Sequence, residues 1–278
     1  MRKSGLTALI LFISLYALWM WSVFAQPPFA DAADWPKTDF SKHAFPLSEI
    51  IEGGPGKDGI QSIDVPEFNS VSEAEKWLHA REPVVAFISG EKARAYPLQI
   101  LMYHEIVNDE VDGQAVAVTY CPLCNAAMVF ARSHNGELLE FGVSGKVHTS
   151  NLIMYDRSTE SWWLQFTGEG VVGKYTGEQL SLLPSQIVSF EQFSNAYPGG
   201  MVLSKQTGFD KKYGVNPYTH YDSRKLPYGW FFQNTVDPRL AAMERVLGVV
   251  AENEVRAYPL SALNAVPILH QQIDETNL

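Results

Sequence analysis

Short apolar runs separated by turn-forming residues dominate the middle of the chain. Six such runs lie between Ala115 and Tyr175, with the sequences AVAVTY, AAMVFAR, LLEFGVSG, NLIMYDR, SWWLQF and EGVVGKY. Segments rich in Ser, Gly, Asn and Asp, such as SHNGE and DRSTES, separate several of them. Short runs that are rich in β-branched and aromatic residues and bounded by turn residues are typical of strands. The pattern therefore predicts an antiparallel β-meander and not an alternation of strands and helices.

Two similar hairpin patterns flank this region. VVAFISGEKARAYPL, residues 84–98, and VLGVVAENEVRAYPL, residues 246–260, align without a gap and share the five residues RAYPL. In each copy two apolar runs enclose a polar turn, and a proline stands where a helix would begin. A repeated identity in matching contexts indicates an internal duplication, whose shared Arg and Tyr we interpret as packing residues. We therefore predict an α+β, β-rich fold, with an antiparallel meander flanked by two related β-hairpin-helix units.

The chain is predicted to have three parts. Residues 1–25 hold two cations followed by an uncharged apolar run, which indicates a signal peptide or, if it is retained, a membrane anchor. Residues 26–65 are rich in Pro, Gly and Asp and are expected to form an extended N-terminal arm. Residues 66–278 are expected to form a single β-rich domain that contains the repeat. Within it, residues 208–238 are crowded with Tyr, Gly, Pro and Asn and predict a long ordered loop.

Export would place the domain in the periplasm or outside the cell, with membrane contact only through an uncleaved N-terminal segment. The formal net charge is −10, and removal of residues 1–25 takes away two cations and no acids, which gives −12. Such a surface repels phosphates, so nucleic acid is not an expected partner. A content of 46% hydrophobic and 12% aromatic residues is ordinary for a chain with a sizeable core.

The only two cysteines of the chain, Cys121 and Cys124, stand three positions apart in TYCPLCNAAMVF. Such a pair has three uses: a tight disulfide, a redox dithiol, or two thiolate ligands for a soft metal. β-Branched and aromatic residues follow Cys124 and lead into a hairpin turn, which favours strand, turn and strand over a helix. An oxidising compartment favours a disulfide, but a bridge across so small a loop constrains the unfolded chain little. All three uses stay open at this point.

A metal site would need further ligands. His104 is the leading candidate for a third ligand, or for the proton acceptor of an exchanging thiol, because a short connection joins its expected helix to the cysteine strand. Met128, His134 and His148 are weaker candidate ligands. Copper or zinc would suit these ligand types, and a redox or metal-donor protein would be the partner. Convergence of His104 on the sulfurs would favour such a site, whereas burial of both sulfurs under apolar side chains would favour a non-catalytic scaffold with a structural disulfide and an aromatic binding loop.

The cysteine segment belongs to a wider set of motifs. Together with FGVSGKVHTSNLIMYDRSTESWW, GVNPYTHYD, ERVLGV and both RAYPL units, it resembles the DUF3179 family of bacterial proteins of unknown function. The resemblance covers about residues 43–278, implies export or membrane anchoring, and carries no established activity. It places the following residues in the motif blocks of the family: His104, Cys121, Cys124, Ser144, Gly145, Asn151, Tyr155 and Asp156.

Several of these residues, with others from the aromatic loop, are candidates for a ligand pocket. The candidates are Ser144, Asn151, Tyr155, Asp156, Tyr218 and Asp222. In the second repeat Val266 aligns with His104, so only the first unit is expected to carry the site.

Overall fold

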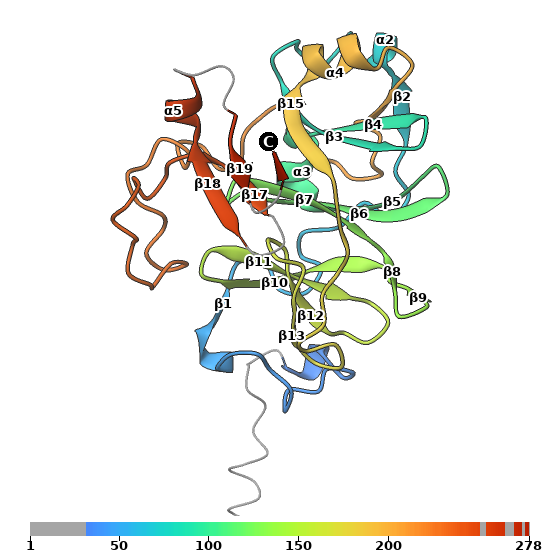
Figure 1. The fold of residues 1–278 in the computed structure, drawn as a ribbon. Coiled ribbons are helices and arrows are strands. Elements are labelled where there is room, and N and C mark those ends of the chain that lie inside the picture. The colour runs from blue at the N-terminus through green and yellow to red at the C-terminus, as the bar shows by residue number, and fades with distance from the viewer. Residues whose placement is uncertain (1–31, 251–253, 265–269, 274–275, 278) are drawn as a thin grey trace, which may run out of the picture.

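The computed structural model describes residues 32–250, 254–264, 270–273 and 276–277. The predicted signal or anchor segment, residues 1–25, lies outside the described residues. In the part that is described, no helix is long and apolar enough to cross a membrane. Strands dominate and the helices are short, so the β-rich class is confirmed (Figure 1).

Three sheets form the body of the molecule (Figure 1). The middle sheet has the order β14-β7-β6-β5, with the bounds Leu182–Leu183, Ala126–Ala131, Gln114–Cys121 and Ile106–Val111. The upper sheet has the order β15-β3-β4-β16-β2, with the bounds Ser185–Ser189, Pro83–Ser89, Lys92–Pro97, Met201–Leu203 and Phe68–Ser70. The lower sheet has the order β1-β10-β11-β12-β13, with the bounds Ile50–Glu52, Phe141–His148, Asn151–Asp156, Trp162–Leu164 and Gly170–Val172.

Smaller elements connect or cover these sheets. Three two-stranded sheets pair β8 with β9, β17 with β18, and β19 with β20, with the bounds Ser133–His134, Glu137–Leu138, Val246–Val250, Val255–Pro259, Gln272–Ile273 and Thr276–Asn277. The helical elements are η1, η2, α2, α3, α4 and α5, with the bounds Ala32–Asp34, Leu47–Glu49, Val71–Ala74, Leu98–His104, Phe190–Ala196 and Leu260–Leu263.

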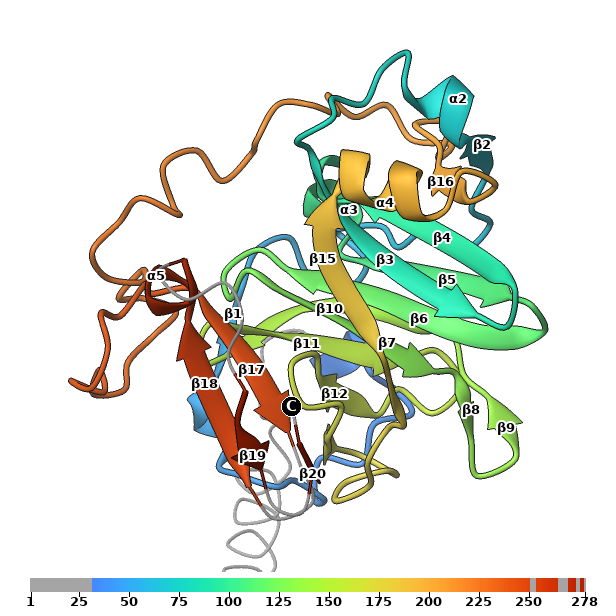
Figure 2. The ribbon, with the colours of Figure 1, turned by 45° about the horizontal axis from the view of Figure 1, so that its top comes forward.

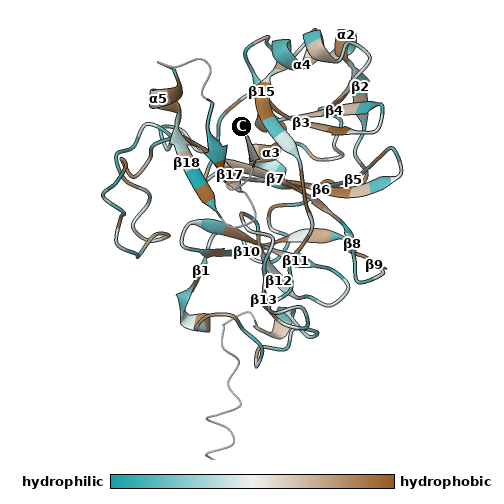
Figure 3. Cartoon of the chain, in the orientation of Figure 1, coloured by the Kyte–Doolittle hydropathy of each residue, from teal (hydrophilic) through white to brown (hydrophobic). Residues whose placement is uncertain are grey.

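The six apolar runs all contain strands, but they do not make one meander. The first two become β6 and β7 of the middle sheet, and the last four become β10 to β13 of the lower sheet. The β8–β9 hairpin stands between the two groups. Apolar residues colour β6 and β7 brown in Figure 3, which reflects their position in the middle layer. A continuous apolar pattern is typical of strands that are covered on both faces.

Both RAYPL copies form the predicted hairpin and helix. β3 pairs with β4, and α3 begins directly after Pro97. β17 pairs with β18, and α5 begins directly after Pro259. Both prolines have an extended backbone at the helix N-cap, with ψ of 130° in each. The fixed φ of proline suits this change from strand to helix.

The likeness continues beyond the segment that the sequence alignment covered. The Tyr96 hydroxyl donates to Asp109 Oδ2 over 2.6 Å, and the Tyr258 hydroxyl donates to Gln271 Oε1 over 2.7 Å; both acceptors lie 13 residues further along. β19 and β20 then pair in the same register as the matching ends of β5 and β6. The repeat is therefore a hairpin, a helix and the start of a second hairpin.

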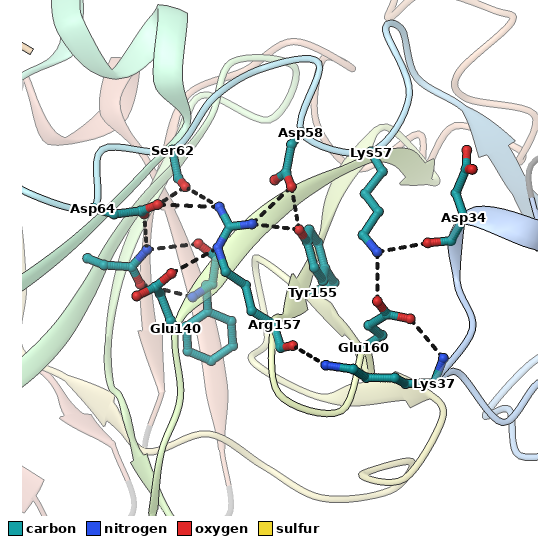
Figure 4. A network of polar contacts seen from close by, with 12 residues as sticks. Asp34, Lys37, Lys57, Asp58, Ser62, Asp64, Glu140, Tyr155, Arg157 and Glu160 are labelled. Atoms are coloured by element: carbon teal, nitrogen blue, oxygen red, sulfur yellow. Dashed lines mark hydrogen bonds and ion pairs between the residues drawn. The ribbon is translucent and has the colours of Figure 1, made fainter. Parts of the chain in front are cut away.

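The described part of the predicted N-terminal arm is packed against the body. Trp35 is 1% exposed and meets the ring of Tyr155 edge-on. β1 extends the lower sheet by pairing with β10. Arg157, in the turn after β11, binds Asp58 Oδ2 at 2.9 Å and Asp64 Oδ2 at 3.4 Å, at the centre of the network in Figure 4. From Ala32 onward this segment is part of the folded body.

The long loop that the sequence predicted is present. Residues 208–245 contain no helix or strand and run from the end of the upper sheet to the second hairpin (Figure 2). The loop passes the strand ends where the cysteines lie, because Tyr221 contacts the carbonyl of Leu123 between the two cysteines. This course brings loop residues to the thiols.

Candidate functional site

The Cys-Pro-Leu-Cys segment is a turn between two strands, as predicted. β6 ends at Cys121, which is the last residue of the ladder and lies opposite Ala126 of β7. Inside the turn the Cys124 amide donates to the Cys121 carbonyl over 3.2 Å. Asn125 has a φ of 49°, a left-handed conformation that Asn tolerates and that returns the chain to β7. Both side chains are thus presented by one tight reversal.

The two sulfurs lie together but differ in their surroundings. They are 2.9 Å apart and unlinked. Cys121 is 1% exposed, inside the apolar cluster beneath the middle sheet, whereas Cys124 is exposed. The pair is therefore neither fully buried under apolar side chains nor fully exposed to solvent.

The start of β11 supplies polar partners for both sulfurs. The Ser150 carbonyl lies 3.3 Å from Cys124 Sγ and 3.6 Å from Cys121 Sγ, where it accepts a hydrogen bond from a protonated thiol. The Asn151 amide group donates to Cys124 Sγ over 3.2 Å, and the Leu152 backbone N–H donates to Cys121 Sγ over 3.4 Å. Ser150 has a φ of 64°, which turns the chain sharply at this point. Its buried hydroxyl has no hydrogen-bond partner among the described residues.

These contacts shift the pKa values of the two thiols in opposite directions. Burial raises the pKa of Cys121, and its hydrogen bond to Cys124 raises it further. The same hydrogen bond, followed by the one from Asn151, lowers the pKa of Cys124. When one proton leaves the pair, the negative charge therefore settles on Cys124, the residue of the two that is exposed. A stabilised, accessible thiolate is the reactive form of cysteine.

A buried carboxyl group, Glu105, lies beside the pair. It follows helix α3 in a left-handed conformation with a φ of 59°, and its carbonyl accepts the Tyr120 amide over 2.8 Å, next to Cys121. The side chain is 6% exposed in the folded protein, and the Tyr218 hydroxyl donates to Oε1 over 3.3 Å. Burial, followed by repulsion from the Cys121 charge, raises the pKa of Glu105 to about 8. No cation forms an ion pair with it in the described part of the chain.

His104, the predicted third ligand, is directed elsewhere. Its Nδ1 lies 2.6 Å from the Gln61 carbonyl, and its Nε2 lies 2.6 Å from the Tyr213 hydroxyl. Because the carbonyl can only accept, we assign the proton to Nδ1. Burial lowers the pKa of His104 and so favours the neutral ring. Both ring nitrogens are therefore occupied in a structural contact.

The described residues contain no group of three His, Cys, Asp or Glu side chains that could hold a metal ion. His104 therefore forms no such group with the two cysteines, and the convergence that would have favoured a metal site is not seen in this part of the chain. The expected helix is present, but strand β5 lies between it and the cysteine strand β6, and the residue after the helix whose charge interacts with that of Cys121 is Glu105. Its left-handed backbone after the helix turns its side chain toward the cysteine strand, and sequence alone does not show this turn.

The weaker candidate ligands serve other contacts. His134 Nε2 lies 2.6 Å from Glu178 Oε2. His148 stacks on Phe45 with ring centroids 3.9 Å apart. Met128 packs against the apolar cluster that contains Cys121.

Two of the six pocket candidates reach the site. Asn151 contacts Cys124, and Tyr218 contacts Glu105. The other four stabilise local structure. The Ser144 hydroxyl donates to the Ile153 carbonyl at the bulge of β10, and the Tyr155 hydroxyl donates to the Asp58 carboxylate. The Asp156 carboxylate accepts the Thr159 amide in the turn after β11. The Asp222 carboxylate lies 3.6 Å from the Arg245 guanidinium.

Three tyrosines surround the thiols. Burial raises the pKa of Tyr120 to about 12, and the charge of Cys121 adds to this rise. Burial also raises the pKa of Tyr221 to about 12, with Cys124 the next cause. Burial and the Glu105 charge raise the pKa of Tyr218. All three hydroxyls therefore stay protonated at neutral pH and can act as hydrogen-bond donors.

The fold and the site together define a β-rich protein with one asymmetric thiol pair in a strand-to-strand turn. The chain belongs to the family described as Protein of unknown function (DUF3179), whose model matches residues 57–278. No curated protein and no solved structure matches the chain.

Proposed function

We propose that the protein exchanges electrons with disulfides through Cys121 and Cys124. The observation that carries this proposal is the asymmetry of the pair: two sulfurs 2.9 Å apart, one in an exposed residue and the other in a buried one. An exposed thiolate can attack, and a buried neighbour can resolve the product without meeting solvent. A purely structural bridge has no need of one accessible sulfur with a lowered pKa.

The reaction proceeds in two balanced steps. The Cys124 thiolate attacks one sulfur of a substrate disulfide, and the other substrate sulfur leaves as a thiolate that takes up a proton. Cys121 then loses its proton and attacks Cys124 Sγ, which releases the second substrate thiol. Two electrons pass from the protein dithiol to the substrate disulfide, and the protein is left with a Cys121–Cys124 disulfide. In reverse, the same steps oxidise a substrate dithiol.

Glu105 is the proton acceptor for Cys121 in this proposal. The second step needs the buried thiol to lose a proton, and Glu105 is a buried carboxyl group whose charge interacts with that of Cys121. With a pKa of about 8, roughly a tenth of Glu105 is ionised at pH 7, and it can both take up and return a proton near neutrality. The hydrogen bond from Tyr218 holds the carboxyl group in place.

The donor set supports exchange better than a zinc centre. Structural zinc takes four ligands, and catalytic zinc keeps three from the protein. The described residues around the cysteines supply two sulfurs and no third His, Cys, Asp or Glu ligand. A copper ion held by the two sulfurs alone is the metal alternative that the experiment below separates from exchange.

The proposed place of action is outside the cytoplasm. The apolar N-terminal segment of the sequence supports export to the periplasm or beyond, where thiol exchange on proteins takes place. The proposed partner is therefore a redox protein or a protein that gains or loses a disulfide there.

Trapping of the intermediate tests the proposal. Cys121→Ser removes the resolving sulfur, so we expect it to accumulate a mixed disulfide with a peptide disulfide, detected by non-reducing electrophoresis and mass spectrometry. Cys124→Ser should form none, because the remaining sulfur is buried. Metal content of the wild type and both variants is measured on the same samples. Stoichiometric copper or zinc that is lost in both variants, together with no mixed disulfide, would contradict the proposal.

A further inference from the structure

The long loop, residues 208–245, is fastened to the thiol turn. The Tyr221 hydroxyl donates to the Leu123 carbonyl over 3.1 Å, inside the Cys-Pro-Leu-Cys turn. The Phe231 carbonyl accepts the Ser150 amide over 2.8 Å, and the Ser150 carbonyl is the group that contacts both sulfurs. The loop is thus held on both sides of the reactive sulfur.

Between these two contacts the loop forms a ladder of aromatic rings. The ring centroids of Tyr221 and Tyr228 are 4.6 Å apart, and those of Tyr228 and Trp230 are also 4.6 Å apart with the rings stacked. Exposure rises along the ladder, from 4% at Tyr221 to 61% at Trp230. A large aromatic side chain that is mostly exposed at the end of an ordered stack is available to a partner.

The loop also differs in charge from the rest of the molecule. Residues 208–245 hold six basic residues against four acidic ones, while the whole chain carries a net charge of −10. The Arg224 guanidinium lies over the ring of Tyr228, 4.6 Å from its centroid, so one cation stands beside the ladder. An acidic partner is repelled by most of the protein surface and attracted at this loop.

We propose that this ladder binds the polypeptide whose disulfide is exchanged at Cys124. The fitting segment is extended, has an aromatic or aliphatic side chain next to its cysteine to stack on Trp230, and has an acidic residue to pair with Arg224. The inference rests on the proposed thiol exchange. We expect a disulfide of only a few atoms at Cys124 to leave Trp230 uncovered, because Tyr221 and Tyr228 stand between the Trp230 ring and Leu123 in the ladder.

The test compares two substrates in the full-length protein. One is an oxidised peptide with a single disulfide flanked by Phe and Asp, and the other is bis(2-hydroxyethyl) disulfide. For Trp230→Ala we expect the second-order rate constant for the peptide to fall about fivefold, in line with the loss of one aromatic contact, and that for the small disulfide to stay within twofold. Tyr197→Ala, which removes an exposed ring directly after helix α4, is the matched control and should change neither rate.

A second peptide with Gly in place of Phe completes a double-mutant cycle. If Trp230 contacts the Phe, the Gly peptide reacts equally well with the wild type and with Trp230→Ala. Equal losses for the peptide and the small disulfide would show that Trp230 supports the thiol geometry, and would overturn the inference. An unchanged peptide rate in Trp230→Ala would overturn it too. If the wild type reacts with neither disulfide, the proposed function itself is contradicted.

Discussion

The two hairpin units contain the same five residues, RAYPL, and differ in what surrounds them. In the first unit Val84 is 0% and Leu98 is 5% exposed, whereas the aligned Val246 and Leu260 are 43% and 41% exposed. The first hairpin is flanked by β15 and β16 within one sheet, and the second has no third strand among the described residues. Equal local sequence thus gives an equal hairpin and helix, but not equal burial.

The difference in burial between the two units also affects the titratable groups that follow them. The first unit leads from α3 through Glu105 and β5 into β6, the strand that ends at Cys121. Its buried setting removes water from both groups and so shifts their proton affinities. In the second unit the position that aligns with Glu105 is Pro267, which cannot titrate. The same hairpin and helix therefore occur twice, and only the first copy is followed by a strand that ends at a cysteine pair.

Truncation of the aligned leucines should destabilise the protein far more in the first unit than in the second. Leu98→Ala should lower the free energy of unfolding by about 3 kcal/mol, because it leaves a cavity in the core. Leu260→Ala should cost less than about 1 kcal/mol, because its side chain already meets water. Urea unfolding of both variants measures the contrast. Equal losses would show that the second unit is as well covered as the first.

Removal of the Glu105 charge should change how the stability of the first unit depends on pH. Burial raises the pKa of this carboxyl from 4.5 to about 8, so the folded state holds the proton more tightly than the unfolded state. Its contribution to stability is therefore complete below about pH 4.5 and is lost as the pH rises through about 8. Glu105→Gln cannot ionise. Between pH 5 and 9 the wild type should thus lose about 4 kcal/mol more than this variant, at about 1.4 kcal/mol for each unit of pKa difference.

Unfolding measured across that pH range gives the result. Glu91→Gln, in the exposed turn between β3 and β4, is the matched control and should follow the wild type. Parallel pH profiles for the wild type and Glu105→Gln would mean that Glu105 titrates like an exposed carboxyl group.

Removal of the tyrosine hydroxyl that both units contain should give a smaller difference in stability between the units. Tyr96→Phe leaves Asp109 Oδ2 without its buried donor and should cost about 1 to 2 kcal/mol. Tyr258→Phe removes the matching bond to Gln271, which water can replace, and should cost less than about 0.5 kcal/mol. Thermal unfolding of the two variants decides the order. A larger loss for Tyr258→Phe would reverse the comparison.

Features that depend on neighbouring residues could be predicted from the sequence. The two hairpins with their helices, the turn at Cys121 and Cys124, and the loop from Gly208 all follow from local apolar and turn patterns. The division of the strands between two sheets did not follow, because strand pairing across the fold leaves no local signature. The extension of the repeat into β19 was also missed, since Asp109 and Gln271 differ in type although they accept the same bond.

Only those parts of the candidate site that lie in local motifs could be found from the sequence. Clear motifs led to the cysteines and to Asn151, and the structure places the Asn151 amide in contact with Cys124 Sγ. His104 was chosen for its chemistry, but a single left-handed residue after the helix places Glu105 at the thiols instead. Ser144 and Asp156 are polar and buried, which resembles a site, yet they satisfy backbone groups at a bulge and a turn. Only the path of the backbone separates such residues from functional ones.

The pH dependence of alkylation of the reduced protein tests the central claim most directly. Iodoacetamide is applied over a series of pH values, and the label on each cysteine is measured by mass spectrometry. We expect Cys124 to react with a midpoint below that of an ordinary thiol, and Cys121 to stay unlabelled until the protein is unfolded. Equal labelling of both cysteines, or no labelling of Cys124 at neutral pH, would contradict the account of an exposed attacking thiol and a buried resolving one.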